Sequence, residues 1–195
     1  MFESIKVLFV LILFYFPFFF LVLIPSNSIF LRPEDLQDDI CTKLALPFLC
    51  DEPSVTLAVI KPDGMSHESQ IKAIIEENGF KIINDKTEKL DVEQVSAWYS
   101  DKQEEPYYPS LVEYLTRGPI RVLALSRRKA VPKLRDLIGP TNPDMARQSF
   151  PKTIRALYGT DIQENAIHAS DSRESAEKEI KFFFAEQDPT HTRHL

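Results

Sequence analysis

The sequence has no surplus of basic charge. Of its 195 residues, 23 are Lys or Arg and 29 are Asp or Glu, and the net charge is −6. Nucleic-acid-binding proteins carry a basic patch or stripe, so we expect no nucleic-acid partner. Residues 25–53 contain two basic and six acidic residues. The part of the chain that follows is therefore close to neutral, and any anion-binding site in it must be built from local groups.

Cysteine is also scarce. Cys41 and Cys50 are the only two in the chain, and both precede the part that has the pattern of a folded domain. Two cysteines provide neither a disulfide framework nor the ligands of a structural zinc site. We interpret them as incidental, with one disulfide open to them if the chain is secreted.

One long apolar run is present, at residues 7–24, and its 18 residues carry no charge. This length is near the minimum for a membrane span and exceeds the usual core of a signal peptide, about 7–15 residues. Pro17 interrupts the run, and Lys6 is the only basic residue before it, which gives a weak orientation signal. Three interpretations of residues 1–24 stay open: an uncleaved signal anchor that contacts the membrane, which we prefer, a cleaved signal peptide, and an artefact of the gene model. Residues 25–53 then form an acidic connector.

Residues 54–186 alternate strand and helix patterns. Apolar and β-branched runs predict strands at 54–60, 80–90, 120–125 and 164–169, with Phe80 and Ile82 facing the core and Ile83 a further candidate. Helical spacing predicts helices at 67–78, 129–138 and 172–184, two more that start at Asp91 and at 104–106, and a short one at 152–158 within an irregular 141–163. The order predicts an α+β, ferredoxin-like split βαβ sandwich with a four-stranded antiparallel sheet. Residues 187–195 form a tail.

Two residues at strand ends can carry chemistry. His168 lies where the fourth strand gives way to the last helix, a position that exposes one side of the imidazole and suits an aimed nucleophile. Lys61 follows the first strand in the turn Lys61-Pro62-Asp63-Gly64. A lysine there can hold a phosphate or a ribose, although many such lysines are only solvated strand ends.

Four motifs and a trailing helix make a family resemblance specific. They are Lys61-Pro62-Asp63-Gly64, Gly139-Pro140-Thr141-Asn142-Pro143, Thr153-Ile154-Arg155, Asn165-Ala166-Ile167-His168-Ala169-Ser170-Asp171 and Glu174-Ser175-Ala176-Glu177-Lys178-Glu179-Ile180. Because the motifs occur in this order with the element spacing kept, residues 54–186 resemble a nucleoside diphosphate kinase domain.

The resemblance implies a ping-pong phosphoryl transfer with nucleoside triphosphates and diphosphates as partners. A triphosphate gives its γ-phosphate to a histidine, and the phosphohistidine then phosphorylates a diphosphate. His168 would be this nucleophile. Glu179 would hydrogen-bond the other ring nitrogen, and Ser170 would support the carboxylate.

The resemblance also implies a nucleotide site made of four kinds of group: guanidinium groups for the phosphates, hydroxyl donors, groups that hold the sugar hydroxyls, and side chains that sandwich the base without reading its edges. Arg135 and Arg155 would supply the guanidinium groups, and Thr141 and Tyr99 would be the hydroxyl donors. Lys61 and Asn165 would hold the sugar hydroxyls, and Tyr107 and Ile162 would sandwich the base. The implied cofactor is Mg²⁺, held largely by the phosphates, with Asp101 placed to reach a metal-bound water.

Two departures from the family pattern affect the function. Ala169 stands where the family usually has glycine, and its methyl is expected to crowd the nucleophile slightly while removing no hydrogen-bond donor. The segment between Asn142 and Thr153 is longer than in housekeeping members, as it is in multidomain and ciliary ones. The longer segment and the unusual N-terminus keep an alternative function open, a weakly active or inactive nucleotide-binding scaffold, with a ciliary or flagellar assembly as one setting for it. A homo-oligomer stays open, and so does the location: membrane-anchored or secretory if the apolar run is functional, cytoplasmic or ciliary if it is not.

Overall fold

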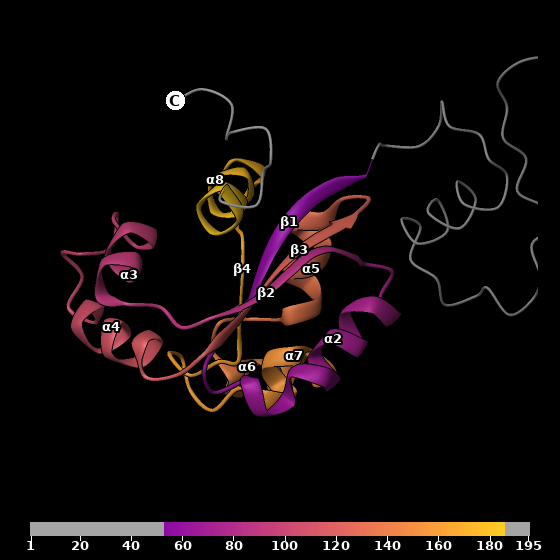
Figure 1. Ribbon diagram of the computed structural model, residues 1–195. Coiled ribbons are helices and arrows are strands. Elements are labelled where there is room, and N and C mark those ends of the chain that lie inside the picture. Colours follow the sequence, from indigo (N-terminus) through magenta and orange to yellow (C-terminus); the bar gives the residue numbers. More distant parts are fainter. Residues whose placement is uncertain (1–52, 186–195) are drawn as a thin grey trace, which may run out of the picture. The chain divides into compact units, whose positions relative to one another are not determined.

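The computed structural model describes residues 53–185 (Figure 1). Its elements are β1 (Ser54–Ile60), the 3₁₀ helix η3 (Met65–His67), α2 (Glu68–Glu77), β2 (Lys81–Glu88), α3 (Val92–Trp98), α4 (Tyr108–Thr116), β3 (Ile120–Arg127), α5 (Ala130–Ile138), α6 (Pro143–Ser149), α7 (Ile154–Tyr158), β4 (Ile167–Ala169) and α8 (Arg173–Phe184). The interpretations of residues 1–24, most of the connector 25–53 and the tail 187–195 lie outside the described residues. Among residues 53–185, no helix has the length and apolar character needed to cross a membrane.

The four strands form one antiparallel sheet in the order β2-β3-β1-β4. Strands β1 and β3 are central, and Val59 of β1 lies opposite Val122 on one side and His168 on the other. The connections through α2 and through α5 make two interlocked crossovers, which is the split βαβ plan. The predicted ferredoxin-like α+β fold is confirmed.

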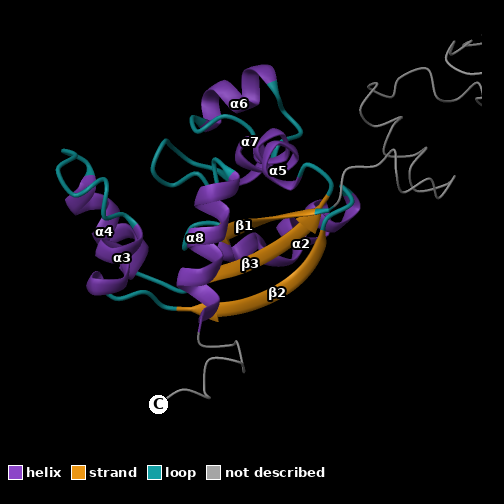
Figure 2. Cartoon of the chain, turned by 90° about the horizontal axis from the view of Figure 1, so that it is seen from above, coloured by secondary structure: helices purple, strands orange, loops and turns teal. Residues whose placement is uncertain are grey.

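Strand β1 is buried on both faces, which explains its continuous apolar sequence. Ala58 and Ile60 pack into a core with α2, α5 and α7, whereas Leu57 and Val59 pack into a second core with α3, α4 and the end of α8. Figure 2 shows α8 lying over the strands and the α3–α4 pair to one side of them. Helices α8 and α3 cover the same face of the sheet, because both contribute side chains to the second core.

Helix α6 is an element that the sequence analysis did not predict. Asn142 caps it, because the side-chain oxygen accepts hydrogen bonds from the backbone N–H groups of Asp144 at 2.9 Å and Met145 at 3.4 Å. Pro143 takes the first helical position, where its missing N–H costs nothing. An Asn-Pro pair is a helix start in this sense, so the sequence did carry the signal. The segment between Asn142 and Thr153, which is longer than in housekeeping members of the family, is thus partly helical.

Two predicted boundaries were wrong. Strand β4 begins at Ile167 and not at residue 164, because Thr160 N–H donates to the carbonyl of Glu164 at 2.7 Å in a tight loop and Ala166 has a φ of 67°. Helix α4 begins at Tyr108 and not at 104–106. Pro106 disfavours helical backbone in the residue before it, whereas Pro109 fits the first turn of the observed helix.

The suggestion that Ile83 faces the core was also wrong. Its side chain is 49% exposed, while Phe80 is buried at 4%. The pairing of β2 with β3 passes from Ile82–Leu125 to Asn84–Ala124, so Ile83 is the extra residue of a β-bulge. Alternation from Phe80 and Ile82 also places Ile83 on the opposite face, so its apolar side chain alone was a poor guide to burial.

Candidate active site

The centre of the site is a hydrogen-bonded pair formed by the strand β4 and the helix α8. Ser172 caps α8 by accepting a hydrogen bond from the N–H of Ser175, and the helix then runs back along β1. This turn brings Glu179 Oε1 to 2.9 Å from His168 Nε2. The hydroxyl of Ser170 donates to the other carboxylate oxygen, Oε2. The contacts expected among these three residues are present.

The carboxyl group of Glu179 is ionised in this setting. Burial raises its pKa, but the hydrogen bonds from His168, Ser170 and Trp98 and the charge of His168 outweigh burial and lower the pKa below its ordinary value. An ionised carboxylate can only accept, so the Nε2 atom of His168 carries the ring proton. Whenever the imidazole is neutral its lone pair is then on Nδ1, and Nδ1 is the atom that can attack.

Trp98 is a third partner of Glu179, and the sequence analysis did not single it out. Its indole N–H donates to Glu179 Oε1 at 3.2 Å, and its ring meets the ring of His168 edge to face at a centroid distance of 5.1 Å. The signal available in the sequence was its position directly before Tyr99, a residue that the family resemblance places in the nucleotide site.

The extra methyl of Ala169 does not crowd the histidine. Ala169 is 6% exposed and packs with Ile167 in the core shared with α2 and α5. Successive residues of a strand point to opposite faces, so the imidazole of His168 faces the α3 and α8 side instead. The expected crowding was wrong for this reason.

Three cations, Arg155, Arg135 and Lys61, lie close enough to affect one another's pKa, and Arg155 lies next to the nucleophile's strand. Arg155 donates to the carbonyls of Gly139 at 2.9 Å and of Ile167, the neighbour of His168, at 3.1 Å. Burial and the nearby charge of Arg135 lower the pKa of Arg155 to about 10. Burial and the charge of Arg155 lower the pKa of Lys61 to about 8. Because like charges destabilise one another here, an anion would be favoured among them.

Gly139 is needed where Arg155 binds. Its φ is +81°, a conformation that glycine adopts at little cost, and a Cβ there would collide with the side chain of Thr153. The carbonyl group that accepts from Arg155 therefore belongs to a glycine, and any residue with a side chain would be strained at this position.

The sugar-binding candidates form a buried pair. The ammonium group of Lys61 donates to Asn165 Oδ1 at 2.8 Å and to the carbonyl of Gln163 at 3.0 Å. The amide of Asn165 donates in turn to the carbonyls of Ile162 at 2.8 Å and Thr141 at 3.1 Å. The structure thus brings together Lys61, Asn165 and the backbone of Thr141, while the side chain of Thr141 is exposed.

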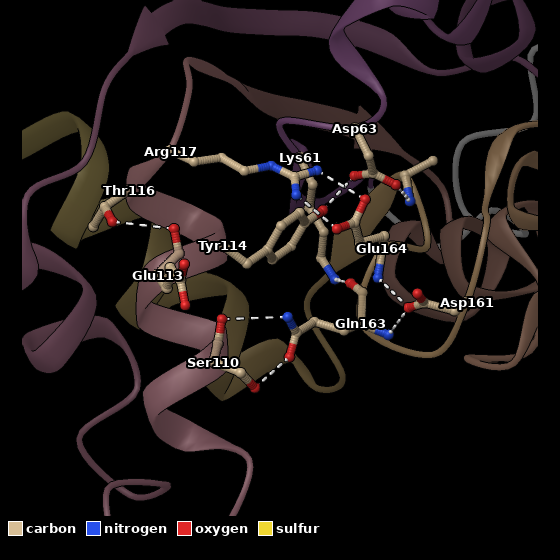
Figure 3. Close-up of polar contacts among 11 residues, drawn as sticks. Lys61, Asp63, Ser110, Glu113, Tyr114, Thr116, Arg117, Asp161, Gln163 and Glu164 are labelled. Carbon is tan, nitrogen blue, oxygen red and sulfur yellow. Dashed lines mark hydrogen bonds and ion pairs between the residues drawn. The ribbon is translucent and has the colours of Figure 1, made fainter.

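Helix α4 is fastened to the loop of residues 159–166 by contacts that the sequence analysis did not identify (Figure 3). Ser110 Oγ donates to Gln163 Oε1 at 2.9 Å, and the guanidinium of Arg117 binds both oxygens of Glu164 at 2.6 and 2.8 Å. Asp63, from the Lys61 turn, accepts from the hydroxyl of Tyr114 and from the N–H of Ala166.

The two base-binding candidates lie one in each of the two segments that the Ser110–Gln163 contact joins. Tyr107 and Ile162 are exposed at 48% and 63%, and each is close in sequence to one partner of the Ser110–Gln163 contact. Tyr99 is half-buried, and burial together with the charge of Glu179 raises the pKa of its hydroxyl, which therefore stays protonated as a donor.

Asp101, the candidate for a metal-bound water, is exposed and pairs with Lys102 at 2.9 Å. Among the described residues there is no group of three or more His, Cys, Asp or Glu side chains that could hold a metal ion alone. An exposed carboxylate fits an outer contact to a hydrated Mg²⁺ that phosphates hold, since Mg²⁺ keeps several waters.

Comparison with known proteins identifies the family. Residues 54–189 match the family model of nucleoside diphosphate kinase. The chain is 48% identical over 128 residues to a probable nucleoside diphosphate kinase 5 of Arabidopsis thaliana, which covers 65% of this chain and 89% of that protein. It is 40% identical over 132 residues to a nucleoside diphosphate kinase of Persephonella marina, covering 67% of this chain and 92% of that protein.

A solved structure agrees in sequence and in fold. The nucleoside diphosphate kinase of Aquifex aeolicus has a TM-score of 0.65 and 38% identity, covering 68% of this chain and 96% of that one. The fold with a half-buried His–Glu pair is the arrangement that these relatives lead one to expect of a nucleoside diphosphate kinase domain. The chain belongs to the nucleoside diphosphate kinase family, and its relatives place it among the nucleotide kinases.

Proposed function

We propose that the chain is an active nucleoside diphosphate kinase that works through a phosphohistidine at His168. The observation that carries the proposal is the bond between His168 Nε2 and Glu179, next to Arg155, which donates to the carbonyl of the neighbouring Ile167. A scaffold that only bound nucleotide would have no use for an oriented imidazole.

In the proposed reaction the lone pair of His168 Nδ1 attacks the γ-phosphorus of a nucleoside triphosphate. The N–P bond forms as the bond to the β,γ-bridging oxygen breaks, and the electron pair leaves with the nucleoside diphosphate. In the second half, a terminal β-phosphate oxygen of another diphosphate attacks the same phosphorus, and Nδ1 leaves. Glu179 stabilises the positive charge that the ring gains.

Catalysis of this kind is mostly positioning and charge stabilisation. Arg155 and Arg135 would hold phosphate oxygens with guanidinium groups, and the hydroxyls of Tyr99 and Thr141 would donate to them. When bound, Mg²⁺ supplies further neutralisation of phosphate charge, and Asp101 would contact it through water. None of these groups needs to touch the base.

We propose that the base lies between Tyr107 and Ile162. Both side chains are exposed, and neither has the polar atoms with which a protein distinguishes one base edge from another, apart from the phenol hydroxyl. Such a site would accept purines and pyrimidines. Lys61 and Asn165, held together at 2.8 Å, would bind the sugar hydroxyls.

Labelling distinguishes this function from a nucleotide-binding scaffold. The full chain, in mild detergent because of residues 7–24, is incubated with Mg²⁺ and ATP labelled at the γ-phosphate. We expect an acid-labile, base-stable phosphate on the protein that any nucleoside diphosphate removes. His168→Ala should lose the label and keep nucleotide binding. His67→Ala, whose ring stacks on Tyr158 at 4.7 Å, serves as the matched control and should keep both.

Two results would contradict the proposal. Turnover retained in His168→Ala would exclude the phosphohistidine mechanism. Nucleotide binding by the unaltered chain without any phosphoprotein would favour the scaffold function instead.

A further inference from the structure

Trp98 touches both members of the catalytic pair. It is the last residue of α3, and the chain contains no other tryptophan. Its indole N–H donates to Glu179 Oε1 at 3.2 Å, the same oxygen that lies 2.9 Å from His168 Nε2. The nucleophile and the indole therefore share one acceptor atom.

The ring of Trp98 is also held in place from two sides. It meets the His168 ring at 5.1 Å and 84°, and the Phe183 ring at 4.9 Å and 84°. Edge-to-face contacts of this kind are favourable arrangements of aromatic rings. Phe183 is buried in the core on this side of the sheet, so the indole links the imidazole to a fixed part of the protein.

A hydrogen bond between His168 and Glu179 cannot by itself fix the direction of either side chain, since each could move with the other. Anchors outside the pair are needed. Ser170 provides one on Oε2, and Trp98 provides the other on Oε1. With a donor on each oxygen the carboxylate cannot rotate about its terminal bond without losing a hydrogen bond.

We propose that Trp98 is a positioning residue for phosphoryl transfer: it fixes the Glu179 carboxylate and the His168 ring so that Nδ1 points at the phosphate. The inference rests on the proposed function, because positioning matters only if His168 is a nucleophile. A tryptophan that served packing alone would make the contact with Phe183 but would not need its N–H directed at Oε1.

The kinetic test compares Trp98→Phe with Val95→Ala in the full chain. Phenylalanine keeps an aromatic ring and removes the N–H. Val95 is buried one turn earlier on α3 in the same core and has no polar side-chain atom, so its truncation controls for loss of packing. We expect Trp98→Phe to lower the rate of single-turnover phosphorylation by ATP about tenfold to a hundredfold, the range set by losing one hydrogen bond to a charged group. The concentration of ATP at half-maximal rate should change by less than about twofold, because the bond does not involve the nucleotide.

The second readout needs no nucleotide. Because there is one tryptophan, nuclear magnetic resonance gives one indole N–H signal, and we expect it to shift and to exchange faster with solvent in Glu179→Ala. The ring nitrogens of His168, identified by their loss in His168→Ala, should show one tautomer in the unaltered chain. In Trp98→Phe the same signals should broaden as the ring gains freedom.

The outcomes separate the two proposals. If the unaltered chain forms no phosphoprotein, the proposed function fails, and the nuclear magnetic resonance signals still test the positioning. If the unaltered chain is phosphorylated and Trp98→Phe matches Val95→Ala in rate and leaves the His168 signals unchanged, the positioning role is overturned.

Discussion

Replacing Glu179 by glutamine tests the central contact of the site with little change in shape. The carboxylate is only 14% exposed and accepts three hydrogen bonds, from His168, Ser170 and Trp98. An amide has one accepting oxygen and one donating NH₂ group. If the amide nitrogen faces Ser170, the serine hydroxyl must turn from donating to accepting; if it faces His168, donors meet donors or the ring must change its tautomer and place its proton on Nδ1.

The expected loss follows from these contacts. Hydrogen bonds to a charged group contribute about 1.5–3 kcal/mol, and about 1.4 kcal/mol corresponds to a factor of ten in rate. Glu179→Gln should then slow the phosphorylation of His168 by about tenfold to 150-fold. If the tautomer reverses, the loss is larger, since the analogous acid-to-amide change beside a catalytic histidine of serine proteases costs about 10⁴-fold.

The assay is the rate of label transfer from ATP to the protein in a single turnover. Glu177→Gln is the matched control, because Glu177 lies on the same helix, its side chain is 60% exposed, and its partner is Arg173 at 2.9 Å. We expect the control to keep the rate. A rate in Glu179→Gln within about twofold of the unaltered chain would refute the view that this carboxylate acts through the histidine.

The charges around the site support four further predictions. Since burial lowers the pKa of Lys61 to about 8, nucleotide affinity should fall as the pH rises through about 8. Lys61→Met should bind nucleotide weakly, and its affinity should not change over this pH range. If calorimetry finds the same pH dependence of affinity in Lys61→Met as in the unaltered chain, Lys61 is not its cause. The unfolded chain keeps this proton to higher pH, so Lys61 should also make the free energy of unfolding rise between about pH 8 and 10.5, a slope that Lys61→Met lacks in denaturant titrations. Arg155→Ala should weaken ATP by about tenfold or more and adenosine far less, as measured by equilibrium binding, whereas an equal loss for both would mean that the arginine is structural. A double-mutant cycle of Arg117→Ala and Glu164→Ala should give a coupling free energy of about 0.2–1 kcal/mol in protein stability that becomes smaller in 1 M salt, as for exposed ion pairs. A larger value that does not depend on salt would mean that this ion pair stabilises the packing of α4 more than an exposed pair does.

The identities of the strands and most helices could be predicted because they depend on local patterns. The continuous apolar run of β1 reflects burial on both faces, and the Asp91 cap at the start of α3 is present, with its carboxylate accepting from the N–H of Gln94 at 2.7 Å. The predictions failed where a local pattern was overridden. Strand β4 is shortened by a tight loop, and Ile83 is the unpaired residue of a bulge; helix α6, in contrast, was missed although Asn142-Pro143 marks its start.

The sequence by itself determined which reactive groups are available and on which elements they lie. His168 at a strand end, Glu179 two turns into the following helix, and Arg155 after Thr153 are all identifiable from motifs and spacing. Chain connectivity almost fixes the His168–Glu179 contact, because only a short turn separates β4 from α8.

Only the tertiary structure decided which groups meet across long stretches of chain. Trp98 and Glu179 are 81 residues apart, and Arg117 and Glu164 are 47 apart. Their contacts depend on how α3 and α4 pack against the sheet, and packing of this kind arises from the summed burial of many side chains on two cores. No local pattern encodes that sum, so the partners that orient the nucleophile became visible only in the fold.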